Sequence, residues 1–351
     1  MRKRSELHDA LSRRDEARVV ALLRDGADIE EHNSHGWTPL MAASLHGQVD
    51  LARLLLDHGT DLHAVNAEGK SAIHYAAMRG GAEAVRLLVR HGAGVNAADT
   101  FGAYTPLHLA AAHCNRETVQ ETCAALLAAG ADVDARTKWG TTALWSAAVA
   151  GRGDLVDFLL RHGADLETRD QEGRTVLIFV AKHGSIGDMV GRLVAHGADV
   201  NAQDAAGRTA LMYAALSARR SAIDALLDSG ADINRQDVRG ATALMYAAGE
   251  SPKGSEIGML GRELSTTSEG GNAPKWDAEK KAARLAKAYR ARAEVLRHLL
   301  GRGADPEQRD ADGRTALDVS RANGNMAGHD NAEVVDALSS ELAEQGNAHA
   351  R

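Results

Sequence analysis

Apolar side chains recur along this 351-residue chain in pairs of short blocks, and each block has the three-to-four-residue spacing of a helix face. The stretch 207–237 contains one complete unit. Thr209 precedes a first helix, a second helix carries Ile223 and the leucines that follow it, and Gly230 ends that helix as a C′ glycine should. The pattern predicts two short helices followed by a polar, exposed turn.

The same unit recurs through most of the chain at nearly constant spacing. The glycine that ends the second helix returns in steps of 33, 33, 38, 33, 34, 33 and 73 residues, at Gly26, Gly59, Gly92, Gly130, Gly163, Gly197, Gly230 and Gly303. A four-residue motif opens each first helix in phase with it, as in Thr38-Pro39-Leu40-Met41 and Thr105-Pro106-Leu107-His108. The period and the motif together resemble the ankyrin repeat.

The resemblance covers nearly the whole chain and identifies it as a member of the ankyrin-repeat family. It implies an all-α fold, an ankyrin-repeat solenoid of stacked helix-turn-helix units with short β-hairpin or turn fingers. Helices this short are marginal alone, so we expect their stability to come from stacking against neighbouring repeats.

The pattern divides the chain into five parts. We expect an N-terminal capping helix pair at 1–32, six repeats and the first helix of a seventh at 33–249, an insertion at 250–292, the completion of repeat seven at 293–309, and a C-terminal capping repeat and tail at 310–351. In the insertion, the glycine- and serine-rich stretch before residue 275 favours a mobile loop. The residues from Asp277 to Gly301 predict one long helix, a backward extension of the second helix of repeat seven.

Repeat three is also longer than its neighbours. Thr105 and Gly130 are 25 residues apart, whereas Thr38 and Gly59 are 21 apart. We place the four extra residues around 115–120, between the two helices and on the edge opposite the fingers.

Composition and charge narrow the class of protein. The net charge of -7 argues against a chain that binds polyanions as a whole. Cys114 and Cys123 are the only cysteines, so no disulfide framework or CxxC metal site is encoded. The basic start is followed by polar residues, and no apolar run is long enough to cross a bilayer. We therefore expect a cytoplasmic monomer.

Chemical motifs are weak in this sequence. His74 and His108 occupy the fourth place of the helix-opening motif, where the resemblance implies a structural hydrogen bond between repeats. His32 with His35, or His108 with His113 and Cys114, could approach each other, but neither spacing resembles a zinc site. We predict no catalytic, cofactor or metal site, no enzymatic activity and no small-molecule substrate.

The resemblance implies that another protein is bound by the finger tips and by the exposed ends of the first helices, along the concave side. Aromatic residues occur at three of the first four tips and at none of the last four, and aromatic residues and methionine are enriched at interface cores. The predicted partner-binding residues are Trp37, His35, Leu45, His46, Lys70, Met78, Arg79, Phe101, Tyr104, His113, Lys138 and Trp139. The alternative is that Trp37 or Trp139 packs on a neighbouring finger.

A second hypothesis places function on the inserted helix. Seven basic residues and two acidic residues lie between Lys275 and Arg292, on an otherwise acidic chain. Such a helix could bind nucleic acid, an anionic lipid surface or an acidic protein, although a basic run is usually only a solvated helix face. The candidate anion-binding residues are Lys280, Lys281, Arg284, Lys287, Arg290 and Arg292. An effector delivered into another cell would have the same sequence features.

Overall fold

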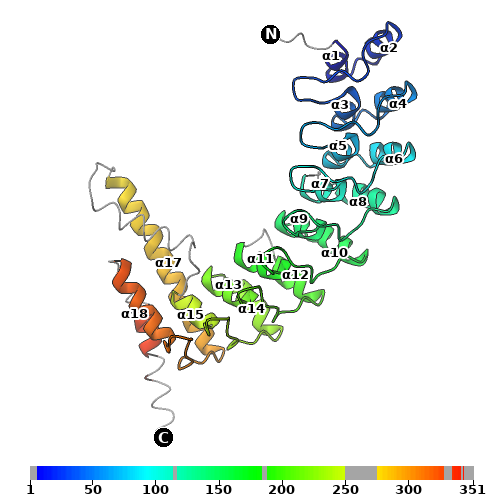
Figure 1. Cartoon of the computed structure of the whole chain (residues 1–351). Coiled ribbons are helices and arrows are strands. Elements are labelled where there is room, and N and C mark those ends of the chain that lie inside the picture. Colours follow the sequence, from blue (N-terminus) through cyan, green and yellow to red (C-terminus); the bar gives the residue numbers. More distant parts are fainter. Residues whose placement is uncertain are drawn as a thin grey trace. The chain divides into compact units, whose positions relative to one another are not determined.

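The protein is an all-α repeat solenoid in which each repeat supplies a pair of helices (Figure 1). The computed structural model describes residues 6–113, 117–183, 188–249, 275–327, 334–340 and 343, with the backbone alone for 275–286 and 323–327. Two compact units divide the chain, Met1–Gln171 (unit 1) and Glu172–Arg351 (unit 2). We describe each unit by itself.

Unit 1 contains the N-terminal helix pair and the first four repeats. Its helices are α1 (Glu6–Ser12), α2 (Glu16–Arg24), α3 (Pro39–Leu45), α4 (Val49–Asp57), α5 (Ala72–Arg79), α6 (Ala82–Arg90), α7 (Pro106–His113), α8 (Val119–Ala128), α9 (Ala143–Val149) and α10 (Gly153–Arg161). The first helices form one layer, in which α1, α3, α5, α7 and α9 pack in succession. The second helices α4, α6, α8 and α10 form the other layer.

Unit 2 continues the same arrangement with one helix of unusual length. Its helices are α11 (Val176–His183), α12 (Met189–Ala195), α13 (Ala210–Leu216), α14 (Arg220–Asp228), α15 (Ala243–Ala248), α17 (Lys275–Gly301) and α18 (Ala316–Ala327). The helices α11, α13, α15 and α18 pack in succession, and α17 packs against α15. The 27-residue α17 confirms the predicted long helix and begins two residues earlier than expected.

The same positions of each repeat form the hydrophobic core. The leucine four residues before the terminal glycine is fully buried in every unit after the first, namely Leu55, Leu88, Leu126, Leu159, Leu193, Leu226 and Leu299. Fully buried alanines such as Ala76, Ala110 and Ala147 lie in the middle of the first helices, where their small side chains allow neighbouring first helices to approach closely. Each repeat therefore completes its core against the next.

Local signals set the helix ends. The hydroxyl groups of Thr38, Thr209 and Thr242 each accept a hydrogen bond from the backbone N–H three residues later, as N-cap residues do. Gly230 follows the C-cap of α14 with φ of +87°, a left-handed conformation that favours glycine. Both kinds of boundary agree with the predicted ones.

The fingers between repeats are tight turns, and none of the described residues is in a β-strand. The loop predicted for 250–274, Cys114, and residues 115 and 116 of the extra segment expected around 115–120 lie outside the described part of the chain, whereas 117–120 form a turn and the start of α8. The start of the C-terminal capping helix also lies outside the described part, although 334–340 is helical and buries Val334 and Leu338.

Candidate partner-binding site

One polar residue folds each finger from within its own repeat, and we call it the finger-base residue. In the second finger, Oδ1 of Asn66 accepts hydrogen bonds from the backbone N–H groups of Glu68 (3.0 Å) and Lys70 (2.9 Å). Equivalent pairs of bonds are made by Asn33, Asp99, Thr137, Asp204, Asp237 and Asp310. The finger-base residue thus accepts hydrogen bonds from the backbone N–H groups of the turn, and the tip side chains point outward.

Backbone hydrogen bonds also join neighbouring fingers. In unit 1, the N–H of Lys138 donates to the carbonyl of Gly102 (2.8 Å), and the N–H of Gln171 donates to the carbonyl of Trp139 (3.0 Å). In unit 2, the N–H of Ala205 donates to the carbonyl of Glu172 (3.0 Å). Each of these bonds fixes one finger relative to the finger before it.

The third finger, from Asp99 to Thr105, is one residue longer than the other fingers. The position next to its tip, where the other fingers have a glycine with positive φ, is Ala103, with φ of +56°. A left-handed conformation is unfavourable for alanine, so the tertiary contacts of this finger must hold it.

Three aromatic rings gather around this longer finger. The ring centroid of Trp139 lies 5.6 Å from that of Tyr104 and 6.5 Å from that of Phe101. Gly102 lies beneath them, and a Cβ at this position would lie only 2.6 Å from a Tyr104 ring carbon and 2.7 Å from a Trp139 ring carbon. The absence of a side chain at Gly102 therefore allows the two rings to pack on the finger backbone.

The ammonium group of Lys138 lies between two of these rings. Its Nζ is 4.9 Å from the Phe101 centroid and 4.5 Å from the Trp139 centroid, within the range of cation–π attraction. It also donates a 2.5 Å hydrogen bond to the Phe101 carbonyl. We call Phe101, Tyr104, Lys138 and Trp139 the finger cluster.

The Phe101 and Trp139 side chains of the finger cluster are exposed to solvent. Phe101 is 63% exposed and Trp139 is 37% exposed, although both are large hydrophobic residues. Tyr104 is half-buried, and burial, followed by the charge of Asp99, raises the pKa of its phenol. The cluster therefore presents apolar ring surface with one cation and one neutral hydroxyl group, which suits recognition of a protein side chain.

Trp37 lies in a different setting. Its ring stacks on His35 at 5.0 Å and packs against Tyr75 of the next repeat at 5.1 Å. Asn66 donates to the Tyr75 hydroxyl (2.9 Å), and burial raises the pKa of Tyr75 to about 12. Trp37 is half-buried, so much of its surface serves the contact between fingers one and two.

The other predicted residues differ in accessibility. Leu45 and Met78 are half-buried at the ends of α3 and α5, and His46, Arg79 and His113 are exposed at the ends of α3, α5 and α7. Lys70 is half-buried and its Nζ lies 2.7 Å from Glu68 and 3.9 Å from Asp99. The structure thus brings Phe101, Tyr104, Lys138 and Trp139 together and places the rest in separate repeats.

His74 and His108 are buried links between repeats. Nδ1 of His74 accepts from the Ser71 N–H (3.1 Å), so its Nε2 carries the proton and donates to the Ala97 carbonyl (3.0 Å). His108 is bonded in the same way to Thr105 and to the carbonyl of Thr141 (3.3 Å). Burial lowers the pKa of both imidazoles, which are therefore neutral structural groups.

The basic helix departs from expectation at one residue. Lys287 and Arg290 are exposed on α17, whereas Arg292 is only 5% exposed. Arg292 lies among the buried residues Ala293, Val295 and Leu296, in the part of α17 that completes repeat seven, and cannot contribute to an anion-binding surface. The side chains of Lys280, Lys281 and Arg284 lie outside the described part.

Several residues that shape the candidate site were not predicted from the sequence. Gly102 and Ala103 could have been found, because Gly92 and Thr105 are 13 residues apart whereas Gly59 and Ser71 are 12 apart. In unit 2, Phe179, Lys182 and Tyr213 carry rings and charge near the finger side, but they lie in first helices, where such residues usually only pack.

Within the described ranges, no group of three or more His, Cys, Asp or Glu side chains could hold a metal ion. No helix among the described residues is both long enough and apolar enough to span a membrane.

The repeats were compared with known proteins. A family model described as Ankyrin repeats (3 copies) matches residues 7–99, 58–136, 97–170, 146–237 and 177–257. Comparison with curated proteins finds no match. Ankyrin repeats are generally protein–protein interaction modules and are typically non-enzymatic. Because the matched residues cover more than half of the sequence, the chain belongs to the ankyrin-repeat family.

Proposed function

We propose that this chain is a non-enzymatic scaffold or adaptor that binds a partner protein through the finger cluster of unit 1. The observation that carries the proposal is the pair Phe101 and Trp139, two exposed rings fixed side by side around Lys138. Exposed aromatic residues on a rigid support are typical of binding hot spots, because little side-chain entropy is lost when a partner covers them.

The surrounding residues suit a supporting role. Val149, 55% exposed at the end of α9, belongs to the same repeat as Trp139 and offers further apolar surface. Met78 and Leu45 offer smaller apolar areas in the preceding repeats. We expect Trp37 to contribute less than Phe101, because its ring is already covered by His35 and Tyr75.

The first experiment places a photo-reactive benzoylphenylalanine at position 101 of the full chain and identifies proteins that become crosslinked in extracts of the native cells. The control carries the same group at position 238, because Val238 is a finger-tip residue that is 71% exposed but has no aromatic cluster around it. A partner protein should crosslink at position 101 and not at position 238.

The affinity of that partner is then measured for the natural chain, Phe101→Ala and Val238→Ala. Loss of a hot-spot residue costs about 2 kcal/mol or more, so Phe101→Ala should bind roughly 30-fold more weakly, and Val238→Ala should bind normally. Equal binding by all three folded proteins would show that the finger cluster is not the site.

A further inference from the structure

Lys138 carries the only charge in the finger cluster, and none of the described residues forms an ion pair with it. Its ammonium group donates one hydrogen bond, to the Phe101 carbonyl, and lies over the rings of Phe101 and Trp139. An ammonium group has three N–H donors, so the other donors of the exposed Lys138 are free to bind water or a ligand.

The finger tips of unit 1 do not supply the missing anion. These tips are residues 34–37, 67–70, 100–104 and 138–141. Glu68 is the only carboxylate among them, and Lys70 pairs with it at 2.7 Å. The carboxylate of Asp99 lies below the third tip with its side chain 0% exposed. The tips therefore leave Lys138 without a counter-charge.

A partner that spans the exposed rings of Phe101 and Trp139 also covers the ammonium group between them. The Nζ atom lies 4.9 Å and 4.5 Å from the two ring centroids, so such a partner displaces water from around it. Removal of a charged group from water is costly unless an opposite charge and hydrogen bonds replace that water. The Phe101 carbonyl accepts only one hydrogen bond from the ammonium group, so the partner has to supply an anionic acceptor.

The hydroxyl group of Tyr104 is a second free donor in the finger cluster. It makes no hydrogen bond with the described residues. It stays protonated at neutral pH, because burial and the charge of Asp99 raise its pKa. The free polar groups of the cluster are thus an ammonium group and a hydroxyl group, which together favour a ligand that accepts hydrogen bonds.

We propose, on the basis of the function proposed above, that the partner presents an aspartate or glutamate side chain flanked by an apolar residue, and that its carboxylate binds the Lys138 ammonium group. The carboxylate carries the single opposite charge that Lys138 requires, and the apolar residue covers the exposed Phe101 ring. A phosphate group would bring about two charges to one cation, and the surplus charge would lose water against the rings.

The test selects random peptides, displayed on phage, for binding to the full natural chain. Peptides that Phe101→Ala binds less well are those that occupy the finger cluster. Lys138→Met keeps most of the side-chain length and removes the charge, whereas Lys138→Arg keeps the charge. Arg53→Met removes an exposed cation from α4 and controls for the change in net charge. Circular dichroism verifies that each variant is folded.

Peptides that depend on Phe101 should be enriched in aspartate or glutamate beside an apolar residue. The affinity of one such peptide is then measured by fluorescence anisotropy, with its acidic residue and with the corresponding amide in its place. The amide peptide should bind about tenfold more weakly to the natural chain, to Lys138→Arg and to Arg53→Met. Its binding to Lys138→Met should fall by less than about twofold, because the group that pairs with the carboxylate is absent there.

Three results would overturn this proposal and leave the proposed function standing. The first is a set of Phe101-dependent peptides without enrichment of acidic residues. The second is an equal effect of the amide on the natural chain and on Lys138→Met, which would place the carboxylate elsewhere. The third is tighter binding when phosphoserine replaces the acidic residue, which would assign Lys138 to a phosphopeptide. If Phe101→Ala weakens no selected peptide, the finger cluster is not the site and both proposals fail.

Discussion

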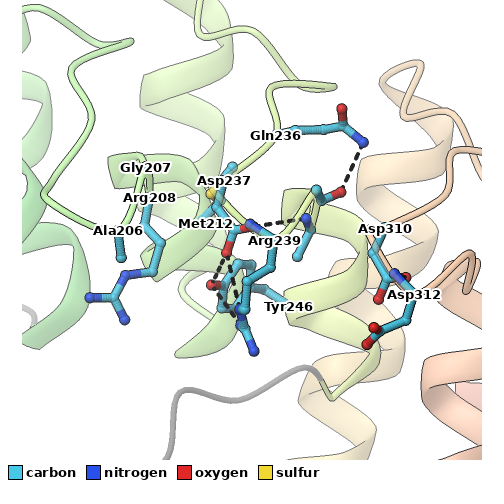
Figure 2. A network of polar contacts seen from close by, with 12 residues as sticks. Ala206, Gly207, Arg208, Met212, Gln236, Asp237, Arg239, Tyr246, Asp310 and Asp312 are labelled. Carbon is cyan, nitrogen blue, oxygen red and sulfur yellow. Dashed lines mark hydrogen bonds and ion pairs between the residues drawn. The ribbon is translucent and has the colours of Figure 1, made fainter.

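The hydroxyl group of Tyr246 donates a 2.7 Å hydrogen bond to Oδ2 of Asp237, a finger-base residue whose side chain is 1% exposed (Figure 2). Tyr213 and Asp204 form the same pair one repeat earlier, at 2.8 Å. Burial raises the pKa of both phenols above the ordinary value of 10.0, and their aspartate partners raise it further. Both tyrosines are therefore permanent donors to a buried carboxylate.

Removal of the donor should have unequal effects at the two sites. Tyr246→Phe leaves Asp237 with its nearest guanidinium nitrogen, from Arg239, at 3.8 Å, whereas Tyr213→Phe leaves Asp204 bonded to Arg208 at 3.0 Å. We expect losses in the free energy of unfolding of about 2–3 and about 1 kcal/mol, respectively. Urea unfolding followed by circular dichroism measures both, and equal losses would argue against a compensating role for Arg208.

The packing of rings on Gly102 predicts a specific sensitivity. Gly102→Ala would place a methyl group within 2.7 Å of ring atoms of Tyr104 and Trp139, so we expect a stability loss of about 1–3 kcal/mol and altered Trp139 fluorescence. Gly94→Ala is the matched control, because its Cβ would meet only Ala97 at 3.6 Å. If both variants behaved alike, the ring contacts would not be what constrains Gly102.

Because His74 and His108 are buried, we expect the stability of unit 1 to fall at acid pH. Their pKa values in the folded chain lie below the ordinary 6.5, so the unfolded chain binds more protons in the interval between those values. Their contribution to stability is therefore complete above about pH 6.5 and is lost as the pH falls below it. Urea midpoints measured between about pH 5 and pH 8 should show this decline.

Substitution of both His74 and His108 tests whether they cause the decline in stability at acid pH. Methionine occupies the same motif position in other repeats, where the N–H of Thr209 donates to Sδ of Met212 at 3.4 Å. The His74→Met, His108→Met variant should lose roughly 1 kcal/mol per inter-repeat bond at neutral pH and show a shallower acid decline. His113→Met, at an exposed site, should retain the decline of the natural chain, and an unchanged slope in the double variant would exclude His74 and His108 as its cause.

We expect substitution of the buried Arg292 to increase the stability of the protein. Among the described residues, its Nε and Nη2 have no hydrogen-bond partner, and burial lowers its pKa. Replacement of a buried, poorly compensated charge by an apolar side chain of similar length often stabilises a protein, so Arg292→Met should raise the unfolding free energy by about 1–3 kcal/mol. Thermal and urea unfolding check this, with the exposed Lys287→Met as the control; a loss of stability would indicate an anionic partner for Arg292.

The fold was predictable because its signals are local and repeated. The helix-opening threonine, the buried leucine and the glycine at the end of the second helix recur in each repeat, so each copy supports the assignment of the others. The long helix α17 was predictable for a similar reason, because the segment from Asp277 to Gly301 contains no helix-ending signal.

The candidate site was predictable only in part, because accessibility depends on side chains from neighbouring repeats. Trp37 and Trp139 look alike as finger-tip residues, yet Trp37 is half-buried against Tyr75 while Trp139 is 37% exposed beside Tyr104. Arg292 follows the exposed Lys287 and Arg290 by only a few residues, but it lies on the buried face of α17, whereas Glu294 and Arg297 beyond it are exposed again. The pattern of residues within one repeat does not show which side chains a neighbouring repeat will cover.

The finger-base hydrogen bonds have a consequence for how such a protein can evolve. Because Asn66 or Asp237 folds its finger with bonds to that finger's own backbone, the residues between base and tip can change without loss of the turn. The third finger shows that even length can vary, since one added residue there leaves the helices on both sides in register. Selection can therefore alter recognition one finger at a time, while the stack that carries the fingers is inherited unchanged.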